Sequence, residues 1–254
     1  MVRTILRFGF AVGHKDCGAL LERFAMMRFG RSGARTQEMT YPQARDFIRK
    51  ATEMGQSGAM PTERARYMAL AVAAQFELML RQMDIIGEWM PAALGVPNSM
   101  MIGSEMWVGG FRWEAIPGWK LRIKTSKSKY RTAVEFDLAA SPLLFPLLNA
   151  VPHAERTGAI VKGEHGLPMR EHSFRKWFRK IARAAGIPDE IWNMDSRAGA
   201  ATEAEEALAN LGGISDNLTH SDGRTTDRYI RRRTKRIAMV TQARVRSRET
   251  DGTS

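Results

Sequence analysis

Residues 220–229 read His-Ser-Asp-Gly-Arg-Thr-Thr-Asp-Arg-Tyr, and this stretch decides how the rest of the chain is interpreted. Ser, Asp and Gly place His220 in a turn, and the paired threonines favour the start of a helix that carries Tyr229. The chain has only four tyrosines, so a tyrosine one turn into a helix and nine residues after a histidine is an unusual order. The plain alternative is a core tyrosine whose hydroxyl is tied to a partner.

A second polar motif lies upstream, where residues 194–200 read Met-Asp-Ser-Arg-Ala-Gly-Ala. Arg197 precedes His220 by 23 residues and falls at the predicted start of a helix, beside backbone N–H groups that favour a phosphate. The small residues after it allow close approach of another backbone. The alternative is an ordinary helix with an isolated arginine.

Two further candidates lie nearer the N-terminus. Arg81 ends an apolar helical pattern and is followed three residues later by Asp84, which could hold the arginine while its guanidinium binds a ligand. A weak surface ion pair explains the same spacing. Lys124 ends a predicted strand at a lysine-rich turn and could donate a proton to a leaving oxygen, although lysines are also common in solvated turns.

The fold class that these patterns predict is mainly α with a small antiparallel three-stranded β-sheet. Helices are favoured by Pro42 and Pro61 at helix starts, by Ser173 as a cap, and by Gly186 and Pro188 as stop signals. The predicted helices begin near residue 41 and cover residues 61–80, 143–151, 173–185 and 198–211, with a last one from Thr225 or Thr226. Period-two alternation predicts strands over residues 113–116, 119–124 and 132–138.

Composition limits the function classes. The chain has 254 residues, 44% of them hydrophobic, which excludes a disordered tail. Its single cysteine, Cys17, excludes an internal disulfide and a cysteine-cluster zinc site. The longest apolar stretch, residues 68–80, is too short and polar to span a bilayer, and the first residues lack a secretory pattern, so we expect a cytoplasmic protein without a membrane partner. A formal charge of +12 favours a polyanion partner, the alternative being a merely soluble basic protein.

In combination, these motifs resemble a known family. Arg81 with Asp84, a hairpin lysine, the Arg197 helix start, His220 and then Thr-Thr-x-x-Tyr resemble, in this order, the catalytic domain of the tyrosine recombinases. Residues 192–199 and 218–221 resemble the phage-type integrases most closely. The resemblance covers roughly residues 40–236 and implies the DNA breaking-rejoining fold of that domain.

The resemblance implies a role for each matched residue. Tyr229 matches the nucleophile that forms a 3′-phosphotyrosine bond with DNA, and Arg81 and Arg197 match the arginines that bind the non-bridging phosphate oxygens. Lys124 matches the general acid for the 5′-hydroxyl leaving group, with Lys127 and Lys129 in the same turn as alternatives. Asp84 would steady the first arginine, and His220 would support the phosphate or the tyrosine. Residues expected to contact DNA are Lys127, Lys129, Arg224, Arg228, Arg231 and Arg232.

The sequence departs from the family pattern at Met194. The family usually has a histidine three residues before the second arginine, and methionine can neither donate a hydrogen bond to phosphate nor move a proton. Two nearby arginines would depress the pKa of Tyr229 and thereby partly substitute for the missing histidine. We therefore predict a slower but active enzyme in which His220→Ala is more damaging than usual.

The resemblance also implies the domain organisation. Residues 1–36 would be the remnant of a core-binding domain with a linker, residues 37–236 the catalytic domain, and residues 237–254 a basic tail. The stretch from Arg228 to Arg248 holds nine basic residues and no acid, which favours contact with the phosphate backbone over a solvated tail. Its apolar residues 237–240 resemble a C-terminal segment that docks on a neighbouring protomer, and packing within the same chain explains them equally well.

Function and partners follow as expectations. The resemblance predicts a site-specific recombinase of a phage or other mobile element that needs no metal, ATP or other cofactor, because arginines, lysine and histidine supply the charge. Its partners would be double-stranded DNA at attachment sites, further copies of the chain in a tetramer on DNA, and an accessory DNA-bending protein. It would act at the nucleoid of a bacterial host cell. The alternatives are a catalytically weakened DNA-binding module and a structural basic helical protein.

Overall fold

The computed structural model describes residues 2–27, 35–96, 99–124, 133–207, 213, 214 and 218, with Lys124, Ala133 and Val134 described by their backbone alone. The chain divides into two compact units, residues 1–35 and residues 36–254. His220, Tyr229 and the C-terminal basic stretch lie outside the described residues, as do Lys127 and Lys129. The predicted helix from Thr225 or Thr226 lies outside them as well.

The short unit is a pair of helices. Helix α1 (Val2–Ala11) and helix α2 (Asp16–Met26) contact each other, and Arg3 donates a hydrogen bond to the Phe24 carbonyl at 2.8 Å. None of the residues in either helix is buried, so the pair has no core of its own. Its descent from a core-binding domain stays a prediction.

The larger unit begins with helix α3 (Tyr41–Gln56), whose start the sequence predicted. Thr40 caps it, because the Thr40 hydroxyl accepts from Gln43 N at 3.4 Å and Gln43 Oε1 accepts from Thr40 N at 2.9 Å. Pro42 occupies the first turn, where its missing N–H costs no hydrogen bond. This reciprocal capping box fixes where the first helix of the unit starts.

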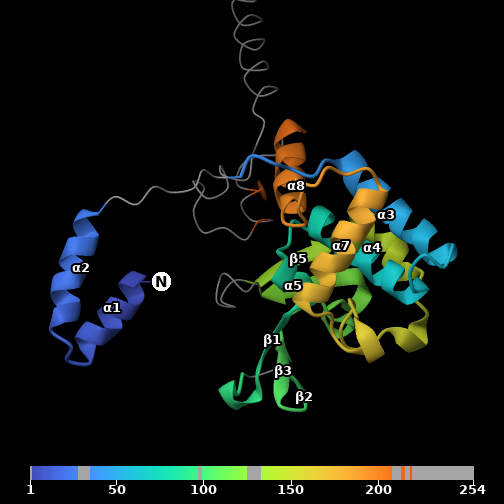
Figure 1. Cartoon of the computed structure of the whole chain (residues 1–254). Helices are drawn as coiled ribbons and strands as arrows, with labels where there is room; N and C mark the ends of the chain where they lie inside the picture. The colour runs from blue at the N-terminus through green and yellow to red at the C-terminus, as the bar shows by residue number, and fades with distance from the viewer. Residues whose placement is uncertain are drawn as a thin grey trace, which may run out of the picture. The chain divides into compact units, whose positions relative to one another are not determined.

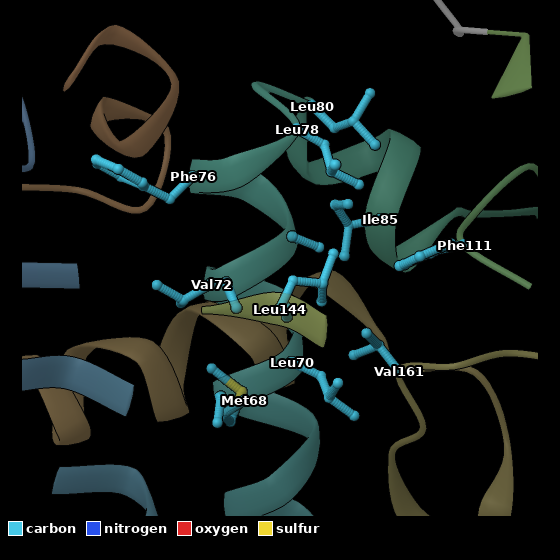
Figure 2. Close-up of a cluster of buried hydrophobic side chains, with 14 of the residues drawn as sticks. Met68, Leu70, Val72, Phe76, Leu78, Leu80, Ile85, Phe111, Leu144 and Val161 are labelled. Atoms are coloured by element: carbon cyan, nitrogen blue, oxygen red, sulfur yellow. The ribbon is translucent and has the colours of Figure 1, made fainter. Parts of the chain in front are cut away.

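Helix α4 (Thr62–Glu77) forms the centre of the unit. Its residues from Tyr67 to Phe76 are all buried, as expected for a helix that is apolar on every side and surrounded by other elements. Helices α3, α6 (Leu144–Asn149), α7 (Glu171–Ala184) and α8 (Asp195–Glu206) all contact it. Figure 2 shows Leu70, Val72 and Phe76 in this core with Ile85, Phe111, Leu144 and Val161.

The β-structure differs from the prediction. Residues 113–116 do not form a strand: Trp113–Ala115 is a 3₁₀ turn, and Trp113 and Ile116 are buried at 8% and 6% exposure. Trp113 and Ile116 are three residues apart and lie on one face of such a turn, whereas in a strand they would point to opposite faces. The other two predicted strands pair antiparallel as β4 (Lys120–Lys124) and β5 (Ala133–Asp137).

The three-stranded antiparallel sheet is built from other residues. Strands β1 (Glu88–Pro91), β2 (Met100–Ile102) and β3 (Glu105–Val108) pair in the order β1-β3-β2 and extend away from the helices (Figure 1). The Trp107 side chain holds this sheet to the body, because its Nε1 donates to the Ile86 carbonyl at 2.7 Å. The predicted fold class is confirmed, with the sheet in a different place.

Helix boundaries also shift by a few residues. Helix α7 begins at Glu171, so Ser173 lies inside its first turn instead of at the cap. Helix α8 begins at Asp195, three residues before the predicted start, and ends in the described part at Glu206. Helix α4 ends at Glu77 because Met79 adopts a left-handed φ of 49°. In the described part of the chain, no helix combines the length and the apolar character that crossing a bilayer requires.

Candidate active site

A cavity of about 590 Å³ contains both arginines that the sequence singles out. Its walls come from the short helix α5 (Gln82–Ile86), from one face of α7 and from the segment that leads into α8. The lining residues are Gln75, Leu80, Arg81, Gln82, Met83, Glu171, Arg175, Phe178, Arg179, Trp192, Asn193, Met194 and Arg197. The fold thus brings residues 81 and 197 to one hollow.

Arg81 is positioned by the acid that the sequence predicted. It occupies the N-terminal cap of α5, its backbone N–H donates to Asp84 Oδ2 at 3.3 Å, and its Nη1 lies 3.8 Å from the same oxygen. Asp84 is 3% exposed. Both terminal nitrogens of Arg81 are buried, and neither makes a hydrogen bond within the described part of the chain. A buried guanidinium in this state requires an anionic partner or water, since an unpaired buried donor is costly.

Arg197 is held more firmly. It is the third residue of α8 and only 3% exposed, and its terminal nitrogens donate to the carbonyls of Met79 and Leu218. Met79 has a φ of 49°, a value that non-glycine residues seldom adopt. This conformation changes the direction of the chain after α4, two residues before Arg81. Arg197 therefore also stabilises the turn that places Arg81 at the cavity.

The outer wall of the cavity is apolar. Met83, Trp192 and Met194 are 39%, 48% and 54% exposed and all line the hollow. Met194 occupies the position at which the family pattern has a histidine. Because this side chain is exposed, a residue at this position can line the cavity without packing into the core. The wall has no titratable group at this position.

The segment around Trp192 is fixed by polar contacts. Trp192 N donates to Asp195 Oδ2 at 2.8 Å, and Arg179 Nη2 donates to the Ile191 carbonyl at 2.9 Å. Asp195 is 2% exposed and begins α8. These contacts therefore tie the segment to the start of the helix that carries Arg197.

The remaining predicted site residues fall at or beyond the edge of the described chain. The backbone of Lys124 ends β4 opposite Ala133, and its side chain is not described. His220, Tyr229, Lys127, Lys129, Arg224, Arg228, Arg231 and Arg232 lie outside the described residues. The structure thus brings together Arg81, Asp84, Met194 and Arg197 and does not test the rest. In the part of the chain that is described, no group of three or more His, Cys, Asp or Glu residues could hold a metal ion.

Sequence reasoning missed several residues that line the cavity. Glu171, Arg175 and Arg179 lie along one side of α7, next to the apolar face that predicted the helix. Their spacing of four residues was a usable signal, because it places all three on one side of the helix. Gln82 and Asn193 gave no such signal, since they meet only after folding.

Solved structures of recombinases share this fold. The structure superposes on XerA recombinase with a TM-score of 0.56 and 12% identity, over 90% of this chain and 73% of that chain. A lambda integrase dimer bound to a COC′ core site gives a TM-score of 0.61 and 16% identity, over 92% of this chain and 57% of that chain. A lambda integrase tetramer bound to a Holliday junction gives 0.56 and 15%, over 90% and 63%. The chain therefore spans little more than half of the lambda integrase chain in that dimer.

Sequence comparison gives the family. No curated protein sequence matches this chain. The family model described as the phage integrase family matches residues 106–236, just over half of the chain. That range contains Arg197, His220 and Tyr229 in the order on which the resemblance rests. The chain belongs to the phage integrase family.

Proposed function

We propose that this protein is a site-specific DNA recombinase that breaks and rejoins DNA through a covalent 3′-phosphotyrosine at Tyr229. The observation that carries the proposal is the guanidinium of Arg81, whose buried terminal nitrogens have no hydrogen-bond partner in the described chain and share a cavity with Arg197. Paired guanidinium groups suit the non-bridging oxygens of a phosphodiester.

The proposed reaction is a transesterification. The phenolic oxygen of Tyr229 attacks the phosphorus, the phenolic proton is lost, and the bond to the 5′-oxygen breaks as that oxygen takes a proton from Lys124. Arg81 and Arg197 stabilise the negative charge that grows on the phosphate oxygens. A 5′-hydroxyl then reverses the step and releases Tyr229, so the energy of the broken bond is retained and neither ATP nor a metal is needed.

The proposal includes the partners. Double-stranded DNA fits the formal charge of +12, and lambda integrase, whose fold is similar, has been solved as a tetramer on a Holliday junction. We accordingly propose that copies of this chain assemble as a tetramer on two DNA duplexes. An accessory DNA-bending protein and action at a bacterial nucleoid complete the proposal.

Capture of a covalent adduct tests this function. The substrate is a library of nicked duplexes with randomised flanks, so that no attachment site need be known, and strands bound covalently to protein are recovered after denaturation and sequenced. We expect adducts that survive denaturation, persist with a metal chelator and without ATP, and disappear in Tyr229→Phe. Adducts that persist in Tyr229→Phe, or form only with metal, contradict the proposal.

A second function is favoured by Met194. This exposed methionine leaves one wall of the cavity without a proton donor or acceptor, as expected of a DNA-binding module that has lost catalysis. Retention of DNA without any adduct in the same assay would identify that module. Failure to bind DNA at moderate salt would indicate a structural basic protein instead.

A further inference from the structure

The two arginines of the cavity reach it from elements that are far apart in the sequence. Arg81 stands at the start of α5, and Arg197 lies in the first turn of α8. Two guanidinium groups bind one phosphate well only if their separation is fixed before the phosphate arrives, because displacement of a binding group by about 1 Å can cost about 100-fold in rate. A contact that joins these two elements therefore controls how the arginines act together.

Such a contact exists beside the arginines. Asn193 Nδ2 donates to Gln82 Oε1 at 2.5 Å, which joins the segment before α8 directly to the first residue of α5. Gln82 follows Arg81 in the chain, and both amide side chains line the cavity. The hydrogen bond thus connects the two arginine-bearing elements in the wall of the cavity that both arginines line.

Both ends of this contact are fixed further. Gln82 Nε2 donates to Glu171 Oε1 at 3.4 Å, and the same oxygen pairs with Arg175, so α7 supports the α5 end. At the other end, Asp195 accepts from Trp192 N, and Asp195 and Arg197 belong to one helical turn. A displacement of Asn193 would accordingly be passed on to α8.

We propose that the Asn193–Gln82 hydrogen bond is a positioning device that sets the separation of Arg81 and Arg197. Neither amide takes part in the chemistry; Asn193 and Gln82 are positioning residues that act through the arginines. This inference rests on the proposed phosphate-binding function of the cavity, and it gives Asn193 and Gln82 a role that neither the motifs nor the family resemblance assigned.

The first test compares adduct formation and DNA affinity. Asn193→Ala and Gln82→Ala are each expected to slow single-turnover adduct formation by about 10- to 100-fold. DNA affinity should change by less than about 3-fold, because the charges that bind the phosphate backbone remain. The double variant should be little slower than either single variant, since both changes remove the same contact. Matched controls are Asn149→Ala and Gln56→Ala, whose side chains are exposed outside the cavity.

An exchange of the two amides separates positioning from a general loss of packing. Asn193→Gln combined with Gln82→Asn moves one methylene from one side of the hydrogen bond to the other and keeps the total reach. We expect the exchanged pair to recover to within about 3-fold of the unmodified rate, whereas Asn193→Gln alone stays slow. Single alanine variants with unchanged rates, or an exchanged pair as slow as the alanine variants at equal thermal stability, overturn the inference.

A measurement without catalysis distinguishes this inference from the proposed function. Inorganic phosphate is titrated into the full chain while the arginine side-chain Nε–H signals of Arg81 and Arg197 are followed by NMR. We expect both signals to shift together in the unmodified chain, and Asn193→Ala to weaken phosphate binding several-fold. If the unmodified chain binds phosphate but forms no adduct, the recombinase proposal fails alone. If Asn193→Ala binds phosphate as the unmodified chain does, the positioning role fails alone.

Discussion

The backbone of Gly199 lies directly against the carbonyl group of Met39, so closely that a Cβ on Gly199 would stand 1.7 Å from Met39 O and 2.7 Å from Met39 C. Met39 N also donates to the Asp195 carbonyl at 3.1 Å. The segment before α3 thus packs along the first turns of α8, the helix that carries Arg197. The absence of a side chain at position 199 is what permits this packing.

Gly199→Ala is therefore expected to be strongly destabilising. The obstacle is main chain, which cannot rotate away as a flexible side chain would, and the glycine is helical, so backbone strain is not the cause. We expect a loss of about 3 kcal/mol or more, and a Tm lower by about 6–12 °C, in thermal unfolding followed by circular dichroism. An unchanged Tm would mean that α8 and the Met39 segment do not pack as described.

The sequence predicted this close contact but not its partner. The small residues after Arg197 indicated that some backbone approaches α8, and Gly199 confirms it. The start signal at Pro42 predicted the beginning of α3 to within about a residue, because such signals are local. The identity of Met39 as the partner depends on long-range packing, which no local pattern encodes.

The β-sheet shows where local patterns mislead. Strands β1 to β3 are short and rich in methionine, and Ile102 and Val108 are their only β-branched residues, the type that usually marks strands. A usable signal was Gly103-Ser104, a two-residue turn with Gly103 at a φ of 61° between β2 and β3.

At the site, the spacing of Arg81 and Asp84 predicted their ion pair, whereas the hydrogen bond between Asn193 and Gln82 joins residues that only the fold brings together.

Glu77 predicts a dependence of stability on pH. Burial raises the pKa of the Glu77 carboxyl, the Leu143 N–H that donates to it at 3.0 Å opposes this, and nearby Glu203 raises it slightly further. The pKa of Glu77 is therefore higher in the folded state than in the unfolded state. At pH values between these two pKa values, the folded protein binds more protons than the unfolded protein. Stability contributed by protonated Glu77 is present at low pH and is lost as pH rises through the folded-state pKa.

Glu77→Gln should remove this loss of stability at higher pH. The side-chain oxygen of glutamine should still accept the hydrogen bond from Leu143 N. At pH 7 we expect a Tm higher than that of the unmodified chain by about 1–3 °C, a small effect because Glu77 is only half buried. The advantage should shrink as pH falls below the folded-state pKa, as thermal unfolding at several pH values would measure. A constant difference at all pH values would contradict this account. Glu63→Gln, an exposed acid in the first turn of the same helix, is the control.

Arg81 and Arg197 are expected to respond differently to truncation. Arg197 is nearly fully buried and donates to two backbone carbonyls, so Arg197→Ala leaves those acceptors unpaired and opens a hole. Among the described residues Arg81 makes one loose ion pair, at 3.8 Å, so we expect its truncation to remove little that stabilises the fold. Both variants should slow adduct formation by at least about 100-fold, since each removes a charge from the phosphate site.

Only Arg197→Ala should also lower stability, by about 2–4 kcal/mol in denaturant unfolding, with Arg81→Ala remaining within about 1 kcal/mol of the unmodified chain. Arg175→Ala, which removes an exposed arginine from the cavity wall, serves as the charge control and should leave stability unchanged. Equal losses of stability in Arg81→Ala and Arg197→Ala would refute the structural difference between them.

Met194 offers a gain-of-function prediction at the same cavity. Its side chain is 54% exposed and lines the hollow, so a histidine fits there without displacing core residues. The family pattern places a histidine at this position, where a neutral imidazole can take the proton of the attacking phenol. Met194→His should therefore raise the rate of single-turnover adduct formation by about 10-fold. The rate should increase with pH through about 6.5, the ordinary pKa of histidine, because only the neutral ring accepts a proton.

Met194→Gln is the matched variant, since glutamine is close to methionine in size and donates hydrogen bonds but does not titrate in this range. A comparison of pH–rate profiles for the two variants decides the question. If Met194→Gln gains as much as Met194→His, the benefit comes from hydrogen bonding alone, and proton transfer at this position is excluded. If proton transfer is restored, His220→Ala should cost less in the Met194→His background than in the unmodified chain, because two histidines would then share the work that His220 is predicted to do without help from position 194.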